Sequence, residues 1–202
     1  MNTLNSGSAF SFRPLRLPLA RRQAVTHGFT LVELAMSLAV LSVLVTFAVP
    51  TFTAMMVSSK LTAASNALLS SMHLARSEAI KRRSRVVLCK SANGAACNAA
   101  GGWEQGWIVF HDSNNNGDRD PGESVIARIE PLPGSMRVNG NAPVAKYVSF
   151  VSTGATKLLG GAFQAGTLTV CDQTASTGEA RVIVLNAVGR PRIQKVSASE
   201  CA

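Results

Sequence analysis

One segment of the sequence carries oxygen-bearing side chains at the spacing of a calcium-binding loop. Residues 112–123, DSNNNGDRDPGE, match the pattern D-x-N-x-N-G-x₅-E, in which alternate residues supply oxygen ligands and a glycine makes the sharp turn. The candidate ligands are Asp112, Asn114, Asn116, Asp118 through its carbonyl oxygen, Asp120 and Glu123. Asn-Gly and Pro-Gly steps are equally typical of a β-hairpin turn, and strand-like runs flank the segment. We therefore favour a turn, with Ca²⁺ as the alternative.

A second segment has side chains suited to binding phosphate. Residues 189–195, GRPRIQK, place two arginines on either side of a proline that stiffens the chain. A guanidinium group binds phosphate through two parallel hydrogen bonds, so Arg190 and Arg192 suit contact with the phosphate groups of a nucleic acid, such as double-stranded DNA. Strand alternation would put Lys195 on the face opposite Arg192. The alternative is a solvated turn whose charges only keep the protein soluble.

The charge balance permits a nucleic-acid partner but does not demand one. The chain of 202 residues has a formal net charge of +9, which falls to +5, from 16 basic and 11 acidic residues, if residues 1–28 are removed. Another basic run, KRRSR at 81–85, lies where a helix is expected to end, and the helix dipole favours cations there. No G-x-S-x-G, P-loop or H-E-x-x-H motif occurs, so we expect no enzyme and no catalytic cofactor.

A single carboxylate stands near the edge of a long apolar run. Residues 29–49 contain 21 residues with Glu33 as the only charge, and a helix of that length spans about 31 Å, close to the ~30 Å hydrocarbon core of a bilayer. Basic residues precede the run and none follows before Lys60. This asymmetry predicts a single pass through the inner membrane, with the N-terminal side in the cytoplasm.

The glutamate gains a partner if the chain is cut between Gly28 and Phe29. A secretory signal is cleaved after its apolar core, whereas a cut here would keep the anchor and create an α-amino group on Phe29. That amine would lie one helical turn from Glu33, and a carboxylate at the bilayer edge needs such a partner. The amine of a neighbouring subunit would serve equally and would set the register of a packed assembly. The alternative is a carboxylate that reaches the headgroups.

Four cysteines predict disulfides in an exported domain. Their spacing lacks a CxxC pair, and an even number after an export-type N-terminus favours disulfides over zinc. Three connectivities are possible. We favour Cys89 with Cys97, which closes a local loop, and Cys171 with Cys201, which fixes the C-terminal end to an earlier strand.

The remaining pattern predicts an α+β protein with one long N-terminal helix packed on an antiparallel β-sheet. Pro50 is expected to kink the helix. An apolar stripe then continues the helix to about Arg82-Arg83, at Leu61, Ala64, Leu68, Met72, Ala75 and Ala79. Short runs rich in β-branched and aromatic residues predict strands at 85–90, 107–110, 125–130, 147–151, 167–171, 181–186 and 192–196. Residues 154–166 are expected to form a flexible loop.

The segment GFTLVEL at 28–34 resembles the processing site of the type IV pilin and pseudopilin superfamily. This resemblance implies cleavage after Gly28 by prepilin peptidase, N-methylation of Phe29 and use of Glu33 in assembly with other pilins or pseudopilins in a filament. It divides the chain into a leader at 1–28, a transmembrane half of the helix at 29–50, an amphipathic half at 51–83 and a β-rich periplasmic domain at 84–202.

The motif ARSEAIKR at 75–82, the Leu-Cys step at 88–89 and GWIVF at 106–110, followed by Asp112 and Gly117, narrow the likeness. Over residues 28–202 the chain is similar to the GspH/FimT family, which contains minor pilins of type IV pili and minor pseudopilins of type II secretion. In FimT-like members a C-terminal GRxR element is associated with DNA binding during natural transformation. Residues Gly189, Arg190 and Arg192 match it, with Lys195 nearby. The GspH-like alternative is a secretion subunit without a DNA role.

Overall fold

The computed structural model describes residues 28–173 and 178–197. The chain divides into two compact units, one that ends at Leu44 and one that begins at Val45, and a single helix, α1 (Leu31–Arg82), contributes to both. Within the described residues, α1 is long enough and apolar enough to cross a membrane. It continues through Pro50 without a break.

The end of α1 is where the sequence predicts it and has a recognisable cap. Arg83 adopts a left-handed conformation with φ of 52°. Its N–H donates to the carbonyl of Ile80, and the N–H of Ser84 donates to the carbonyl of Ala79. These two bonds form a Schellman motif, which satisfies carbonyl groups that the helix end would leave unpaired. The chain then leaves directly into the first strand.

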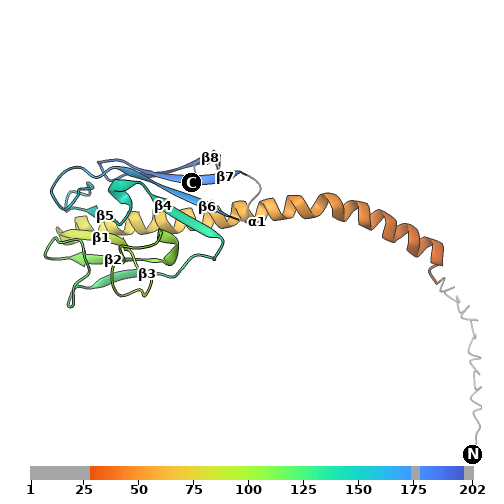
Figure 1. The fold of residues 1–202 in the computed structure, drawn as a ribbon, viewed down its shortest axis with the longest axis horizontal. Helices are drawn as coiled ribbons and strands as arrows, with labels where there is room; N and C mark the ends of the chain where they lie inside the picture. Colours follow the sequence, from red (N-terminus) through yellow and green to blue (C-terminus); the bar gives the residue numbers. More distant parts are fainter. Residues whose placement is uncertain (1–27, 174–177, 198–202) are drawn as a thin grey trace, which may run out of the picture. The chain divides into compact units, whose positions relative to one another are not determined.

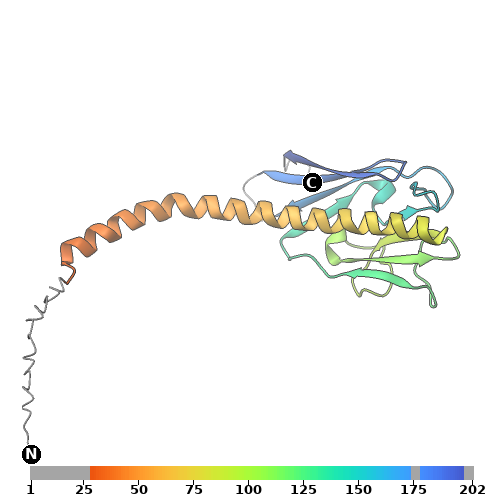
Figure 2. The same cartoon turned by 180° about the vertical axis from the view of Figure 1, so that it is seen from behind.

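The strands form two four-stranded antiparallel sheets, both in the unit that begins at Val45 (Figures 1 and 2). The first has the order β3-β2-β1-β5, from β1 (Arg85–Lys90), β2 (Trp107–Asp112), β3 (Val125–Ile129) and β5 (Tyr147–Phe150). The second has the order β4-β6-β7-β8, from β4 (Met136–Gly140), β6 (Gly166–Asp172), β7 (Glu179–Leu185) and β8 (Pro191–Ser197). Two short 3₁₀ turns lie at Trp103–Gln105 and Ala142–Val144.

The apolar stripe of α1 joins both sheets in one core. All six residues that the sequence assigned to the stripe are buried: Leu61, Ala64, Leu68, Met72, Ala75 and Ala79. They pack in a single cluster with side chains of β1, β2 and β5 from one sheet and of β4, β6 and β7 from the other. Burying each large aliphatic side chain contributes about 1.5–3 kcal/mol, so this stripe fixes the sheets on the helix. Figure 2 shows this part of α1 running along both sheets.

The fold class is confirmed, with three differences from the sequence prediction. The strands form two sheets rather than one. Strands β4 and β5 both follow β3 in the sequence, but β5 pairs in the first sheet and β4 pairs in the second. Strand β4 was missed, since MRVNG contains only two apolar side chains and ends in Asn-Gly. The segment expected to be a loop contains a small hairpin, in which Lys157 is bridged to Phe163.

Candidate functional site

The arginine segment begins in the turn between β7 and β8, and close contacts and hydrogen bonds fix the backbone of this turn. Gly189 has φ of +76°, and a Cβ there would lie 2.1 Å from the carbonyl oxygen of Gly154, so only glycine fits. Its carbonyl accepts a hydrogen bond from Nη1 of Arg76 at 2.9 Å. Asn186 closes the turn, because its side-chain oxygen accepts the N–H of Arg190 at 2.8 Å. The backbone that carries the arginines is therefore tied to α1 and to a neighbouring loop.

The two arginines of this turn are exposed and have no acidic partner among the described residues, whereas Lys195 lies near an acidic side chain. Arg190 and Arg192 both face solvent, and neither takes part in an ion pair with another described residue. Ile193, between Arg192 and Gln194, packs against the core. Lys195 shares the side of Ile193, as predicted, and its Nζ lies 3.9 Å from Oε1 of Glu179. The structure thus brings Arg190 and Arg192 to one turn and leaves Lys195 at the far end of the strand.

The other basic run, KRRSR, is largely engaged at the helix end. Arg82 Nε lies 2.7 Å and Lys81 Nζ 3.5 Å from the carboxylate of Glu78. The hydrogen bond from Arg82 lowers the pKa of Glu78. Arg85 donates to Ser149 Oγ at 2.7 Å. This run therefore serves the helix end and the adjoining sheet, in agreement with the dipole interpretation.

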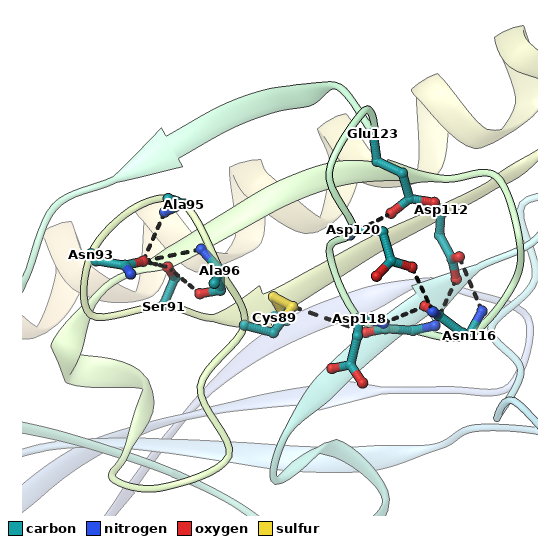
Figure 3. The surroundings of a disulfide bond; sticks show 12 residues. Cys89, Ser91, Asn93, Ala95, Ala96, Asp112, Asn116, Asp118, Asp120 and Glu123 are labelled. Atoms are coloured by element: carbon teal, nitrogen blue, oxygen red, sulfur yellow. Dashed lines mark hydrogen bonds between the residues drawn. A yellow bond between two sulfur atoms is a disulfide. The ribbon is translucent and has the colours of Figure 1, made fainter.

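The acidic segment forms the turn of the β2–β3 hairpin, which confirms the turn interpretation. Asp112 is fully buried, and its carboxylate accepts the N–H groups of Asn116 at 3.1 Å and Gly117 at 3.0 Å. Glu123 accepts the N–H of Ser113 at 2.7 Å and that of Asp120 at 3.1 Å. Asp112 pairs with Arg85, at the end of β1 away from Cys89, and Figure 3 shows the carboxylates of this loop close to one another. The loop closes on its own amide groups.

The rest of the candidate calcium ligands also bond within the loop. Oδ2 of Asp120 accepts the side-chain amides of Asn114 and Asn116, both at 2.7 Å. Asp118 is exposed, and its N–H donates to Oδ1 of Asn116. In the part of the chain that the structure describes, no group of three or more His, Cys, Asp or Glu side chains is arranged to hold a metal ion. Calcium binding stays a prediction.

Burial and hydrogen bonding move the pKa values of two loop carboxyls in opposite directions. Desolvation of Asp112 raises its pKa, against the opposing effect of the N–H of Gly117. Burial also acts to raise the pKa of Glu123, but the hydrogen bonds from Asp120 and Ser113 outweigh it and the pKa is lowered. Glu123 is therefore held as a carboxylate at neutral pH, as its role as an acceptor requires.

One disulfide follows the favoured pairing. Cys89 of β1 is bonded to Cys97, which closes the loop after that strand. Cys171 in β6 is not a free thiol. Its predicted partner, Cys201, lies outside the described residues.

The processing site precedes a capped helix start. Gly28 and Phe29 lie before the first turn of α1, and Phe29 is exposed. The hydroxyl of Thr30 accepts the N–H of Glu33 at 3.2 Å, which is half of a capping box. Glu33 thus occupies the first helical turn, where the dipole favours an anion. Sequence reasoning missed this local role, although the letters T-L-V-E contain its signal.

Two further polar contacts escaped sequence reasoning. Ser84 Oγ lies 2.7 Å from Nε2 of His111, while Asp112, the neighbour of that histidine in the sequence, binds loop amides instead. Nζ of Lys157 lies 6.0 Å from the ring centroid of Phe163, a phenylalanine that is 72% exposed. Ser84 and His111 lie far apart in the sequence, and Lys157 and Phe163 lie within a segment expected to be a loop. The spacing of residues in the sequence therefore predicted neither contact.

Comparison with known proteins gives one family match. Residues 64–189, more than half of the chain, match the family model described as type II transport protein GspH. None of the curated proteins matches the sequence. The type IV minor pilin FimU of Pseudomonas aeruginosa is 17% identical, with a TM-score of 0.47 over 70% of this chain and 92% of that one. The minor pseudopilin EpsH from the type 2 secretion system of Vibrio cholerae is 8% identical, with a TM-score of 0.45 over 68% and 97%.

Proposed function

The chain belongs to the family of the type II transport protein GspH and is a minor pilin or pseudopilin of the GspH/FimT type, and from this premise we propose that it is a subunit of a type IV pilus that binds DNA. The apolar part of α1 is its candidate membrane anchor. In this proposal the anchor crosses the inner membrane once, the β-rich domain lies in the periplasm, and the protein enters a filament with other pilins.

One observation carries the DNA-binding part of the proposal. Arg190 and Arg192 are exposed, and no ion pair with another described residue neutralises them, on a turn that Gly189, Asn186 and Arg76 hold in one conformation. A turn whose backbone is fixed in advance loses little backbone entropy when its arginines bind phosphate. The neighbouring strand residue Lys195 adds a weaker, partly engaged charge.

Duplex binding measured at several salt concentrations tests this role. We expect the full chain in detergent micelles to bind a DNA duplex with an affinity that falls as salt rises. Replacing Arg190 and Arg192 by alanine should flatten the salt slope by roughly one unit for each arginine that contacts phosphate. Lys81→Ala is the matched control, because that cation is engaged by Glu78. An unchanged affinity and slope in the double variant would remove the site.

Filament assembly rests on Gly28, Phe29 and Glu33 in this proposal. Prepilin peptidase would cut after Gly28, and the methylated amine of Phe29 would pair with Glu33 of the same or a neighbouring subunit. Glu33→Ala should still be processed but should fail to enter filaments, whereas Glu33→Asp should retain part of its incorporation. Mass spectrometry of the membrane-purified protein reports the mature N-terminus and its methylation. Normal incorporation of Glu33→Ala would contradict the pairing.

The second candidate is a minor pseudopilin of type II secretion without a DNA role, and the description of the matching family favours it. The two candidates differ in what removal of the protein does. Loss of the pilus subunit should impair piliation and DNA uptake, while loss of the secretion subunit should retain exported enzymes in the periplasm.

A further inference from the structure

We propose that the arginine turn belongs to a wider surface that prefers single-stranded DNA, in which Phe163 stacks on an unpaired base. This inference rests on the DNA-binding function proposed above and names the form of DNA. The surface, here called the turn surface, consists of Arg190 and Arg192 from the β7–β8 turn and Lys157 and Phe163 from the loop after β5.

Hydrogen bonds join the two parts of the turn surface. Thr156 donates its N–H to the carbonyl of Ala187 at 3.2 Å and its hydroxyl to the carbonyl of Asn186 at 3.0 Å. Asn186 in turn accepts the N–H of Arg190. Lys157 follows Thr156 directly. Both segments lie at the end of the domain where α1 terminates, as the two opposite views show (Figures 1 and 2).

The charge of the turn surface suits a polyanion. Residues 151–166 and 186–197 contain no acidic residue, and they carry Lys157 and three further basic side chains. The carboxylate of Glu78, on the last turns of α1, is engaged by Lys81 and Arg82. A phosphate backbone that runs from the arginines to Lys157 meets no acidic residue of these two segments, and the exposed Asp118 lies further along, in the pocket that Leu159 lines.

The exposed ring selects the form of the nucleic acid. Phe163 is 72% exposed, and its backbone is fixed by the bridge to Lys157 and by the buried Gln164, whose side chain binds three backbone groups of residues 143–149. An exposed aromatic ring on a held backbone and beside a cation is the arrangement that stacks the bases of single strands. Bases inside a duplex are already stacked on each other and cannot reach such a ring.

Fluorescence anisotropy with the full chain in detergent micelles tests the inference. The probes are a labelled single-stranded 20-mer and a duplex of the same sequence at equal salt. We expect the single strand to bind more tightly, and Phe163→Ala to weaken single-strand binding about tenfold while leaving duplex binding unchanged. Phe163→Trp should retain the preference because indole also stacks. Val188→Ala, which removes an exposed apolar side chain of the adjoining β7–β8 turn, is the matched control and should change neither affinity.

The outcomes separate this inference from the proposed function. If Arg190→Ala with Arg192→Ala weakens both probes but Phe163→Ala weakens neither, the stacking inference fails and the DNA function stands. If poly-glutamate of equal charge competes as well as the single strand, the surface recognises charge alone and the inference fails too. If neither probe binds in a salt-dependent way, the proposed DNA function itself fails. Circular dichroism melts of each variant check that the fold is intact.

Discussion

The turn between β2 and β3 and the turn between β7 and β8 are built from opposite charges, and they use those charges in opposite ways. The acidic turn directs its buried carboxylates at its own amides, through Asp112 and Glu123. The basic turn is held by a glycine and an asparagine, and its arginines face solvent. Charge alone would mark both turns as binding sites.

The difference follows from hydrogen-bond chemistry. A carboxylate accepts hydrogen bonds, and the tight part of a turn presents N–H donors, so an acidic side chain can satisfy its own turn. A guanidinium only donates, and in the basic turn the carbonyl of Gly189 accepts from Arg76 rather than from Arg190 or Arg192. The availability of a charged group to a ligand thus depends on whether its own loop can bond to it.

The largest expected effect is on the free energy of unfolding, and it comes from the contact of the basic turn with the loop at Gly154. Gly189→Ala would bring a Cβ 2.1 Å from the carbonyl of Gly154 in a left-handed conformation. Because backbone must shift to relieve this contact, we expect a loss of about 3–5 kcal/mol in unfolding free energy. Thermal and denaturant unfolding of the full chain in detergent measure it. Gly160→Ala is the control, since a Cβ there meets nothing within 4 Å. Equal melting of both variants would show that the turn is not locked.

The next effect concerns the acidic turn. Asp112→Ala would leave the buried N–H of Gly117 without its acceptor, whereas the N–H of Asn116 keeps Asn114 Oδ1, and we expect a loss of about 1–3 kcal/mol. Asp118→Ala removes the same charge from an exposed position and should change stability by less than about 0.5 kcal/mol. The same unfolding measurements compare the two variants. A similar loss from both would mean that charge, rather than the buried acceptor, stabilises this turn.

Sequence reasoning recovered the parts of the molecule that periodicity and local chemistry determine. The stripe from Leu61 to Ala79, the end of α1 and the Cys89–Cys97 pairing all follow from spacing along one segment. It failed where tertiary partners decide. Whether strands β4 and β5 share a sheet depends on pairing across the fold, and the contact of Arg76 with Gly189 joins residues 113 positions apart.

The candidate sites divide in the same way. Exposure of Arg190 and Arg192 agrees with the alternation expected of a strand after a stiff turn. The use of Asn114 and Asn116 as donors to Asp120 could not be read from the sequence, because the amide group offers a donor and an acceptor and only the folded loop chooses between them.

A smaller effect comes from the opposite pKa shifts within the acidic turn. Glu123 has a lowered pKa in the folded state, so its contribution is present above the unfolded pKa and is lost as pH falls through the folded pKa. The stability advantage over Glu123→Gln should therefore shrink as the pH falls from 7 to 3. Asp112 has a raised pKa, so its charged form destabilises the folded state. As the pH falls over the same range, the wild type should therefore gain stability relative to Asp112→Asn. If the unfolding free energies of the two variants, each relative to the wild type, changed with pH in the same direction, the opposite pKa shifts would be contradicted.

The smallest expected effect is that of calcium, and it tests the contrast between the turns most directly. A calcium ion at the acidic turn would have to displace the amide donors of Asn114 and Asn116 from Asp120 and the backbone donors from Asp112 and Glu123. The competing bonds are already made, so we expect a flat calorimetric titration of the full chain with Ca²⁺. A saturable heat that Asp112→Ala abolishes and Asp118→Ala retains, because alanine keeps the backbone carbonyl, would instead make the acidic turn a metal site.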